Sequence, residues 1–268
     1  MSAERGGFPA SPSRLEAKWF VTMHVGVQVL FSSFMAREPF IVFGYGSLIF
    51  KPPPHVVAQV PGFLKGYVRR FAQKSHDHRG TPEHPGRVVT LVHKEDWDLF
   101  SSEDAFPDED IVWGIAYTID PVFEDEVRAY LGEYLLLLGL RALTDGYTME
   151  TIPIYSIVNG EEKIIIPNAY SYVGRKDNPS FCAAQFVFLT MADHSVVGSE
   201  PLPALAHRIW ISVGPSGQNK EYLYHLADAV RHLSPDSVDR HLFTLEEMVK
   251  KLDGSDTSPV DNIEALSQ

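Results

Sequence analysis

The order of strand-like and helix-like segments is the feature that most constrains the fold of this chain. Short apolar and β-branched runs, typical of strands, fill much of its first two-thirds, at residues 39–43, 66–73, 87–92, 111–117, 149–158 and 163–173. One helical pattern interrupts them, beginning at Asp120 and Pro121 as an N-cap followed by a first-turn proline. From Pro203 onward the patterns are helical, and Asn219 is a candidate N-cap of a helix there. Strands that come first and helices that come last, without strict alternation, predict an α+β fold.

The two ends of the chain differ in composition from its middle. Residues 1–18 are rich in Gly, Pro, Ser and charge, and the residues after Gly254 are rich in Ser and Asp. Residues 19–35 are more apolar, but polar residues interrupt them, so neither a membrane span nor a clean secretory signal is expected. We therefore expect a disordered or atypical N-terminal extension over 1–38, one domain over 39–253 and a disordered tail over 254–268.

Charge and cysteine content narrow the classes of function. A net charge of −12 argues against a nucleic-acid partner, because no broad basic face would neutralise phosphates, but it says little against a small anionic substrate. The single cysteine, Cys182, excludes an internal disulfide framework and a cysteine-based zinc cluster. This cysteine usage fits a reducing compartment, so we expect a cytoplasmic protein. From the charge and the lack of a clean apolar span, we expect it to bind no nucleic acid and to enter no membrane.

A glycine-rich turn, Gly44-Tyr45-Gly46-Ser47-Leu48, follows the first strand pattern. Two glycines that flank a tyrosine let the backbone approach a ligand closely and expose amide N–H groups, which suits a carboxylate or a developing oxyanion. The turn is not a nucleotide motif, because a dinucleotide fingerprint would place a third glycine at Ile49 and a P-loop would continue with Gly-Lys-Ser/Thr. A plain strand-to-loop corner is the alternative interpretation.

Three further motifs accompany this turn. They are Ser75-His76-Asp77-His78-Arg79-Gly80-Thr81-Pro82, Pro85-Gly86-Arg87-Val88-Val89-Thr90-Leu91 and Gly214-Pro215-Ser216-Gly217-Gln218-Asn219-Lys220-Glu221-Tyr222-Leu223. In this order the four stretches resemble the ChaC-type γ-glutamylcyclotransferases, over about residues 41–233. The resemblance implies a γ-glutamylcyclotransferase-like fold, a small curved mixed sheet or barrel with packed helices and the pocket at one end.

The resemblance also implies a reaction and a site. Members of this family are lyases that cleave glutathione to 5-oxoproline and Cys-Gly. In this reaction the substrate's own α-amine attacks its γ-carbonyl. No cofactor and no metal are required. One carboxylate can carry both protons, and backbone amides can hold the oxyanion. The family positions that bind substrate map to Tyr45, Gly46, Ser47, Leu48, Ser75, Arg79 and Tyr222.

Some of these residues have other interpretations. Arg79, instead of clamping a substrate carboxylate, could form an ion pair with Asp77 or Glu83 that only orders its loop. Tyr222 stands at a spacing that also suits a core residue. A metal site is not expected, because no standard zinc arrangement matches the spacing of His76, His78 and His84.

The chain departs from the family pattern in two places. In the family, a helix ending in Tyr-Leu runs promptly into Arg-Glu and Gly-Tyr, and that glutamate is the catalytic acid and base. Here a leucine-rich insert, residues 132–145, separates Leu131 from Gly146 and contains no Arg-Glu pair. Glu133 is the predicted replacement, with Asp145 as the alternative. A second apolar insert spans residues 182–199, and both inserts suggest retained intron sequence.

Three functional hypotheses follow from this pattern. The first is a glutathione-specific γ-glutamylcyclotransferase in which Glu133 is the catalytic carboxylate. The second is a catalytically impaired member that only binds γ-glutamyl compounds, and the third is a cyclotransferase for other γ-glutamyl amides. A carboxylate that reaches the glycine-rich turn distinguishes the first from the second, and product analysis distinguishes the first from the third.

Overall fold

The structure is a computed structural model that describes residues 38–99, 102–137, 147–174 and 199–255, with the backbone alone for 133–137, 147 and 255. The chain divides into two units, Met1–Pro39 and Phe40–Gln268, and the described helices and strands all lie in the second. A seven-stranded sheet comprises β1 (Ile41–Gly44), β2 (Val56–Lys65), β3 (Tyr67–Ser75), β4 (Gly86–His93), β5 (Ile111–Ile119), β6 (Tyr147–Val158) and β7 (Glu161–Gly174). A two-stranded ribbon of β8 (Val213–Gly214) and β9 (Gly217–Gln218) is separate from it.

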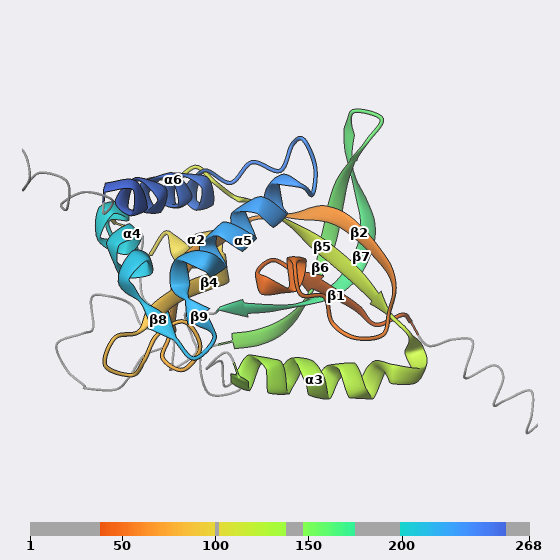
Figure 1. The fold of residues 1–268 in the computed structure, drawn as a ribbon. Coiled ribbons are helices and arrows are strands. Elements are labelled where there is room, and N and C mark those ends of the chain that lie inside the picture. The colour runs from red at the N-terminus through yellow and green to blue at the C-terminus, as the bar shows by residue number, and fades with distance from the viewer. Residues whose placement is uncertain (1–37, 100–101, 138–146, 175–198, 256–268) are drawn as a thin grey trace, which may run out of the picture. The chain divides into compact units, whose positions relative to one another are not determined.

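Five of the strands close into a barrel. Neighbours follow the order β1-β5-β2-β6-β7, and β7 returns to β1, where Tyr170 pairs with Val42 in parallel. Outside the barrel, β4 joins β7 in parallel at Val92 and Gly174, and β3 is antiparallel to β4. Figure 1 shows the tip of the β6–β7 hairpin projecting beyond the barrel. The barrel and its packed helices confirm the predicted α+β class.

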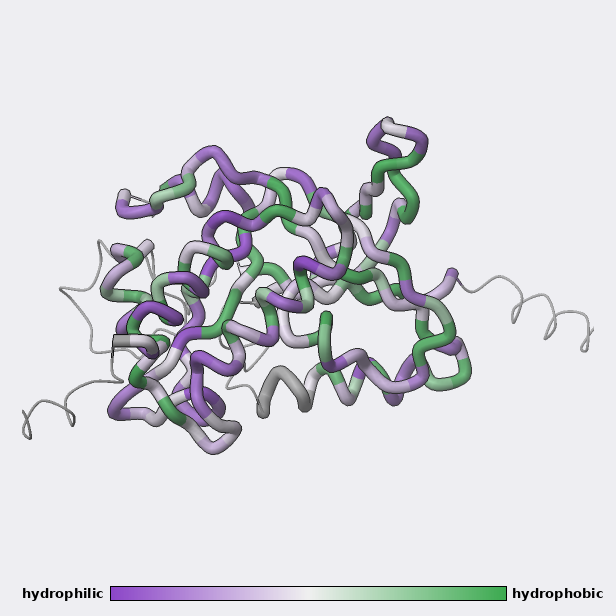
Figure 2. Tube along the Cα trace, turned by 45° about the horizontal axis from the view of Figure 1, so that its top comes forward, coloured by the Kyte–Doolittle hydropathy of each residue, from purple (hydrophilic) through white to green (hydrophobic). Residues whose placement is uncertain are grey.

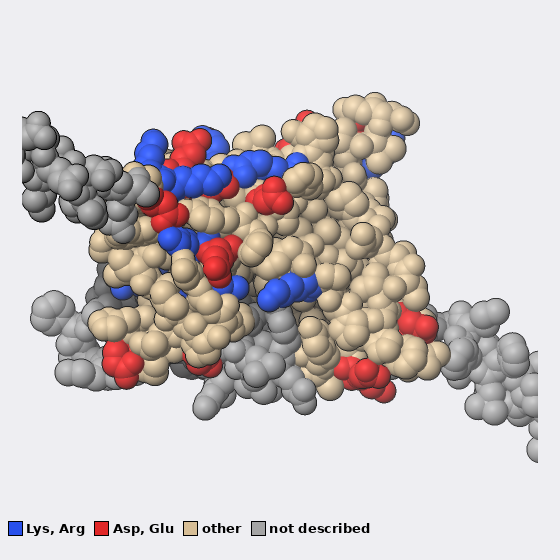
Figure 3. Space-filling view, in the orientation of Figure 1, with Lys and Arg blue, Asp and Glu red and all other residues tan. Residues whose placement is uncertain are grey.

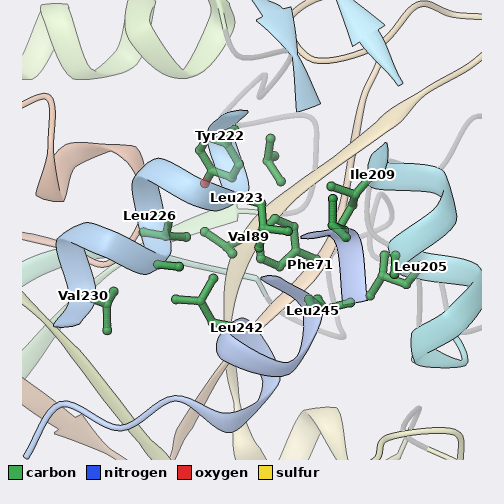
Figure 4. Close-up of a cluster of buried hydrophobic side chains, with 14 of the residues drawn as sticks. Phe71, Val89, Leu205, Ile209, Tyr222, Leu223, Leu226, Val230, Leu242 and Leu245 are labelled. Atoms are coloured by element: carbon green, nitrogen blue, oxygen red, sulfur yellow. The ribbon is translucent and has the colours of Figure 1, made fainter. Parts of the chain in front are cut away.

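Helices cover this sheet in two places. Three of them, α4 (Leu202–Ile211), α5 (Asn219–Arg231) and α6 (Arg240–Ser255), pack together, and their buried side chains meet those of β3 and β4 in one apolar cluster (Figures 1 and 4). Separately, α3 (Glu124–Leu137) packs Val127 and Leu131 against Val42 of β1 and Tyr117 of β5. In Figure 2 the hydrophobic stretches lie mainly in the interior strands, and hydrophilic stretches follow the outer loops. Short helical turns complete the described elements: η1 (Ser47–Ile49), α2 (Lys94–Trp97) and η2 (Pro121–Phe123).

Local capping shows where the sequence patterns succeeded and failed. The Asp120 side chain accepts a hydrogen bond from Val122 N at 3.0 Å, so the predicted cap before α3 is confirmed. Asn219 is the first residue of α5, and its side chain does not cap that helix. Instead, Oδ1 accepts from Arg87 N and Nδ2 donates to Arg87 O, each at 2.7 Å. The predicted capping role of Asn219 is therefore wrong, because the amide joins α5 to β4.

The structure tests only in part the expectations that the protein enters no membrane and binds no nucleic acid. Within the described residues, no helix is both long enough and apolar enough to cross a membrane, and the apolar segment 19–35 lies outside them. On the face drawn in Figure 3, basic and acidic side chains are interspersed over the helical region. Ion pairs join acidic and basic side chains of the helices, including those of Glu246 with Arg231 and Lys250. The absence of a nucleic-acid partner and a cytoplasmic location stay predictions.

Candidate functional site

The glycine-rich turn leaves β1 at Gly44 and runs directly into η1. Ile49 N donates to Gly46 O at 3.0 Å, which closes the turn. Gly46 has a φ of −125°, so it is not needed for a left-handed conformation. It is needed for space: a Cβ there would lie 3.1 Å from Val89 Cγ2 and 3.4 Å from the Tyr222 hydroxyl oxygen. The turn therefore faces Tyr222 at close range with backbone alone.

Buried side chains hold two carbonyl groups of this turn. Arg69 Nη1 donates to Tyr45 O at 2.9 Å, and the Tyr117 hydroxyl donates to Leu48 O at 2.7 Å. Burial raises the pKa of Tyr117 to about 12, so this hydroxyl stays a proton donor at neutral pH. The sequence motifs gave no indication of either residue. Both lie in ordinary strand patterns, and only the folded sheet brings them to the turn.

The Tyr45 ring anchors the turn from the other side. It packs against two apolar clusters: the one shared by α4, α5, α6, β3 and β4, and a second one formed by buried residues of the strands. Burial raises the pKa of its hydroxyl, although a hydrogen bond with the backbone of Leu91 opposes that shift. The side chain of Tyr45 thus serves packing, and binding of a ligand by the N–H groups of the turn stays a prediction.

Two motifs that are distant in sequence interlock beside this region. Ser216 N donates to His78 O at 2.9 Å, and the Ser216 hydroxyl is hydrogen-bonded to His78 Nδ1. A Cβ on Gly214 would lie 2.4 Å from Gly80 N, so the two loops touch backbone to backbone. Burial, then the charges of Arg79 and Lys51, lower the pKa of His78 to about 4, so its ring is neutral at physiological pH.

Arg79 lies at the centre of the interlocked loops and is only 5% exposed. Its Nη1 donates to Gln218 O at 2.9 Å and lies 3.6 Å from Glu221 Oε2. Among the described residues, Arg79 pairs with Glu221, so the alternative pairing with Asp77 or Glu83 is wrong. Its buried Nε has no hydrogen-bond partner within the same described ranges. The guanidinium therefore retains donor capacity for a carboxylate.

Tyr222 occupies the first turn of α5 and connects the glycine-rich turn to Arg79. Its ring is 5% exposed and packs against Phe50 and Phe71 with centroid separations of 6.2 and 6.0 Å. Arg79 Cζ lies 5.9 Å from the same ring centroid. Figure 4 shows Tyr222 at the margin of the apolar cluster. The ring is core, and the hydroxyl oxygen would lie 3.4 Å from a Cβ on Gly46. A role of Tyr222 in binding substrate stays a prediction.

Ser75 is fully buried at the end of β3. Its Oγ accepts a hydrogen bond from Arg79 N at 2.9 Å, which fixes the start of the Arg79 loop. The structure thus unites the turn, Ser75, Arg79 and Tyr222 in one region. A direct contact between Ser75 and substrate stays a prediction.

The structure describes the two predicted catalytic carboxylates only in part. Glu133 lies on α3, where the backbone alone is described, and Asp145 lies outside the described residues. Leu131 is buried and belongs to the apolar cluster that α3 forms with β1 and β5. The role of Glu133 as the catalytic carboxylate, with Asp145 as the alternative, stays a prediction.

No group of three or more His, Cys, Asp or Glu side chains suited to a metal ion occurs among the residues that the structure describes. His76, His78 and His84 belong to that part of the chain and form no such group. The expectation that the reaction needs neither metal nor cofactor stays a prediction.

The fold and this site together define a known class. A crystal structure of a γ-glutamyl cyclotransferase specific to glutathione from yeast is similar to this chain, with a TM-score of 0.62 and 31% sequence identity. The similarity covers 80% of this chain and 97% of that one. The class is therefore the γ-glutamylcyclotransferase-like fold, as the sequence motifs predicted.

The chain belongs to the ChaC-like protein family, whose model matches residues 40–252. A glutathione-specific γ-glutamylcyclotransferase of Schizosaccharomyces pombe is 40% identical over 210 residues, which cover 78% of this chain and 92% of that protein. The protein of the same name from Saccharomyces cerevisiae is 34% identical and covers 78% and 95%. A human glutathione-specific γ-glutamylcyclotransferase 1 is 30% identical and covers 78% and 77%.

Proposed function

We propose that this protein is a γ-glutamylcyclotransferase that cleaves glutathione to 5-oxoproline and Cys-Gly. The observation that carries the proposal is the backbone-only approach of Gly46 to Tyr222, beside the buried Arg79. A surface of N–H donors next to one fixed cation suits the γ-glutamyl group, which carries a carboxylate and a reacting carbonyl. The relatives named for this activity, which match most of the chain, support the same substrate.

The reaction is an internal transfer that consumes no water. The α-amine nitrogen of the γ-glutamyl group forms a bond to the γ-carbonyl carbon, and the carbonyl oxygen becomes an oxyanion. The bond from that carbon to the cysteine nitrogen then breaks. The ammonium loses two protons as it becomes the lactam N–H, and the cysteine nitrogen gains two protons as it leaves and becomes an ammonium. One carboxylate that accepts and returns a proton in each transfer therefore completes the cycle.

The proposal assigns a role to the glycine-rich turn, to Arg79 and to Tyr222. The backbone N–H groups of Tyr45, Gly46, Ser47 and Leu48 bind the γ-glutamyl end and receive the oxyanion, a function worth about 3 kcal/mol per donor. Arg79 binds a substrate carboxylate through the donors that Gln218 and Glu221 do not use. The Tyr222 hydroxyl lines the pocket opposite Gly46.

The direct test is product analysis with the full-length protein. Incubation with glutathione should release 5-oxoproline and Cys-Gly in equal amounts, detected by mass spectrometry, and added chelator should leave the rate unchanged. γ-Glutamyl-alanine serves as the comparison substrate. Faster turnover of that dipeptide than of glutathione would assign the protein to other γ-glutamyl amides, and activity lost in chelator but restored by zinc would contradict the metal-free reaction.

The proton carrier is proposed to be Glu133, and its test is Glu133→Gln. This substitution should lower kcat about 10²- to 10⁴-fold with little change in KM, because the amide cannot transfer the proton. Glu126→Gln is the matched control, since Glu126 lies on the same helix and its side chain is 62% exposed. Asp145→Asn tests the alternative carboxylate. A chain whose kcat withstands both Glu133→Gln and Asp145→Asn would rule out both assignments.

A second candidate function is binding without turnover. It is favoured by the leucine-rich insert 132–145, which separates Leu131 from Gly146 and contains no Arg-Glu pair. In that case the protein should bind glutathione but release no 5-oxoproline. Replacing residues 132–145 with a short segment that places Arg-Glu before Gly146 should then create activity.

A further inference from the structure

Arg69 is a buried cation that the proposed reaction does not use. It lies on β3 with its side chain 1% exposed, beside Asp239, whose side chain is 7% exposed. Nε donates to Asp239 Oδ2 at 2.8 Å, and Nη2 lies 2.7 Å from the same oxygen. Nη1 donates to Tyr45 O and to Trp113 O, each at 2.9 Å. One guanidinium therefore joins the glycine-rich turn, β5 and the start of α6.

The hydrogen bond to Tyr45 O fixes the direction of the Gly46 N–H as well as that carbonyl. The peptide bond between Tyr45 and Gly46 is planar and trans, so its N–H points opposite to its C=O. Holding Tyr45 O toward Arg69 therefore directs Gly46 N–H away from Arg69. Tyr117 holds Leu48 O at the other end of the turn, so both ends of the segment are fixed from the protein side.

The electrostatics also favour a role beyond stability. Removing a guanidinium and a carboxylate from water costs several kcal/mol each, and apolar pairs of similar volume often stabilise a fold equally well. Burial alone would raise the pKa of Asp239, but Arg69 and the N–H of Leu242 hold that pKa below its usual range. The pair thus stays charged at neutral pH. Arg69, its cation, contacts the glycine-rich turn, which approaches Tyr222 through Gly46.

We propose that Arg69 and Asp239 are positioning residues that orient the Gly46 N–H toward the substrate. This inference rests on the proposed function, because it takes the glycine-rich turn as the surface that binds the γ-glutamyl group. Donors that are fixed before the reaction need no reorganisation in the transition state, and groups that hold such donors commonly affect rate about 10- to 100-fold. Asp239 acts through Arg69, which it locks in place.

The test compares Arg69→Lys with Arg70→Lys. Arg70 is the next residue on β3, its side chain is 3% exposed, and it pairs with Asp104 and Glu109 rather than with the turn. The two variants therefore make the same change in two similar buried ion pairs: the charge is kept and the guanidinium is lost. Lysine cannot reproduce the fork that bonds Asp239 and two carbonyls together, so Arg69→Lys should lower kcat about 10- to 100-fold at a nearly constant KM. Arg70→Lys should leave kcat within about threefold, because the Arg70 side chain bonds Asp104, Phe106 O and Arg69 O but not the turn.

A second readout does not depend on turnover. In full-length protein labelled with ¹⁵N-glycine, the Gly46 amide resonance is identified by its loss in Gly46→Ala. It should shift in Arg69→Lys and stay in place in Arg70→Lys. If Arg69→Lys does not fold, Asp239→Asn replaces it, because it removes the anchoring charge and should shift the same resonance.

The outcomes separate the two ideas. Equal losses of kcat in Arg69→Lys and Arg70→Lys, or an unmoved Gly46 amide in Arg69→Lys, would overturn the positioning role. A wild-type protein that neither binds nor cleaves glutathione would overturn the proposed function instead. In that case the Gly46 amide still decides whether Arg69 orients the turn.

Discussion

At Gly46 the space between the turn and its neighbours is too small for a branched side chain. Val89 and the Tyr222 hydroxyl would lie 3.1 and 3.4 Å from an added Cβ, and the methyl groups of valine extend further. Gly46→Val should therefore lower kcat/KM for glutathione at least about 100-fold, because it fills the surface on which the backbone meets the ligand. We expect the fold to persist, because the φ of −125° is not a left-handed angle that favours glycine.

The control for this substitution is Gly254→Val. Gly254 lies on α6 and has no heavy atom within 4 Å of an added Cβ. Circular dichroism and thermal unfolding establish that both variants fold, and calorimetry measures their affinity for glutathione. Wild-type affinity in folded Gly46→Val protein would show that the turn is only a strand-to-loop corner.

His241 makes stability depend on pH. Its Nε2 accepts a hydrogen bond from Phe71 N at 3.3 Å, and burial, then the charge of Arg70, lower its pKa to about 3. An unfolded histidine titrates near ~6.5, so the unfolded chain takes up this proton first as pH falls. The unfolding free energy should therefore decrease from about pH 6.5 downward until His241 itself titrates near pH 3.

His241→Gln isolates this effect, because the glutamine oxygen can accept from Phe71 N but does not titrate. Between pH 7 and pH 5 the wild type should lose about 2 kcal/mol relative to the variant, from one histidine whose pKa stays well below pH 5. Urea unfolding at both pH values measures the difference. A stability difference that is constant across this range would show that His241 carries its proton in the folded state.

Individual elements were predictable where one face of a pattern is buried. The helical spacing of Leu223, Leu226, Ala227, Val230 and Leu233 predicts one buried stripe. The first four are fully buried on α5, whereas Leu233 lies beyond the end of the helix and is only partly buried. Strand β2 was not predicted, because Pro61 and Gly62 disfavour a strand and most of its residues before Phe63 are exposed. Pairing with β5 over nearly its whole length stabilises β2, and no local pattern reveals such a partner.

The joint between α5 and β4 depends on one amide. Asn219 is fully buried and bonds both the N–H and the C=O of Arg87 at 2.7 Å. Asn219→Ala should lower the unfolding free energy by about 3 kcal/mol, because two buried backbone groups lose their partner. Asn219→Asp keeps the acceptor and loses the donor, so it tests the two bonds separately. Urea unfolding that shows a loss below about 0.5 kcal/mol in Asn219→Ala would contradict this assignment.

At the scale of the whole molecule, sequence motifs named the residues of the candidate site but not the residues that support it. The turn, Arg79 and Tyr222 belong to short contiguous motifs, which a resemblance carries, and their roles toward substrate stay predictions. Arg69 and Asp239 are 170 residues apart and belong to no such motif, yet they hold the turn in the folded chain. Their contact depends on α6 packing against β3, and a buried charge pair leaves no periodic signal in either segment.

The boundaries of the folded unit yield the last prediction. The apolar clusters of the described chain draw their buried residues from positions between Phe40 and Val249, and the family match spans 40–252. A chain of residues 38–255 should therefore unfold with the same urea m-value as the full protein, because m scales with the surface that unfolding exposes. Its Tm should also agree within about 2 °C. An m-value lower by more than about 15% would show that residues 1–37 or 256–268 bury surface in the native protein, and separate removal of each end would identify which of them does.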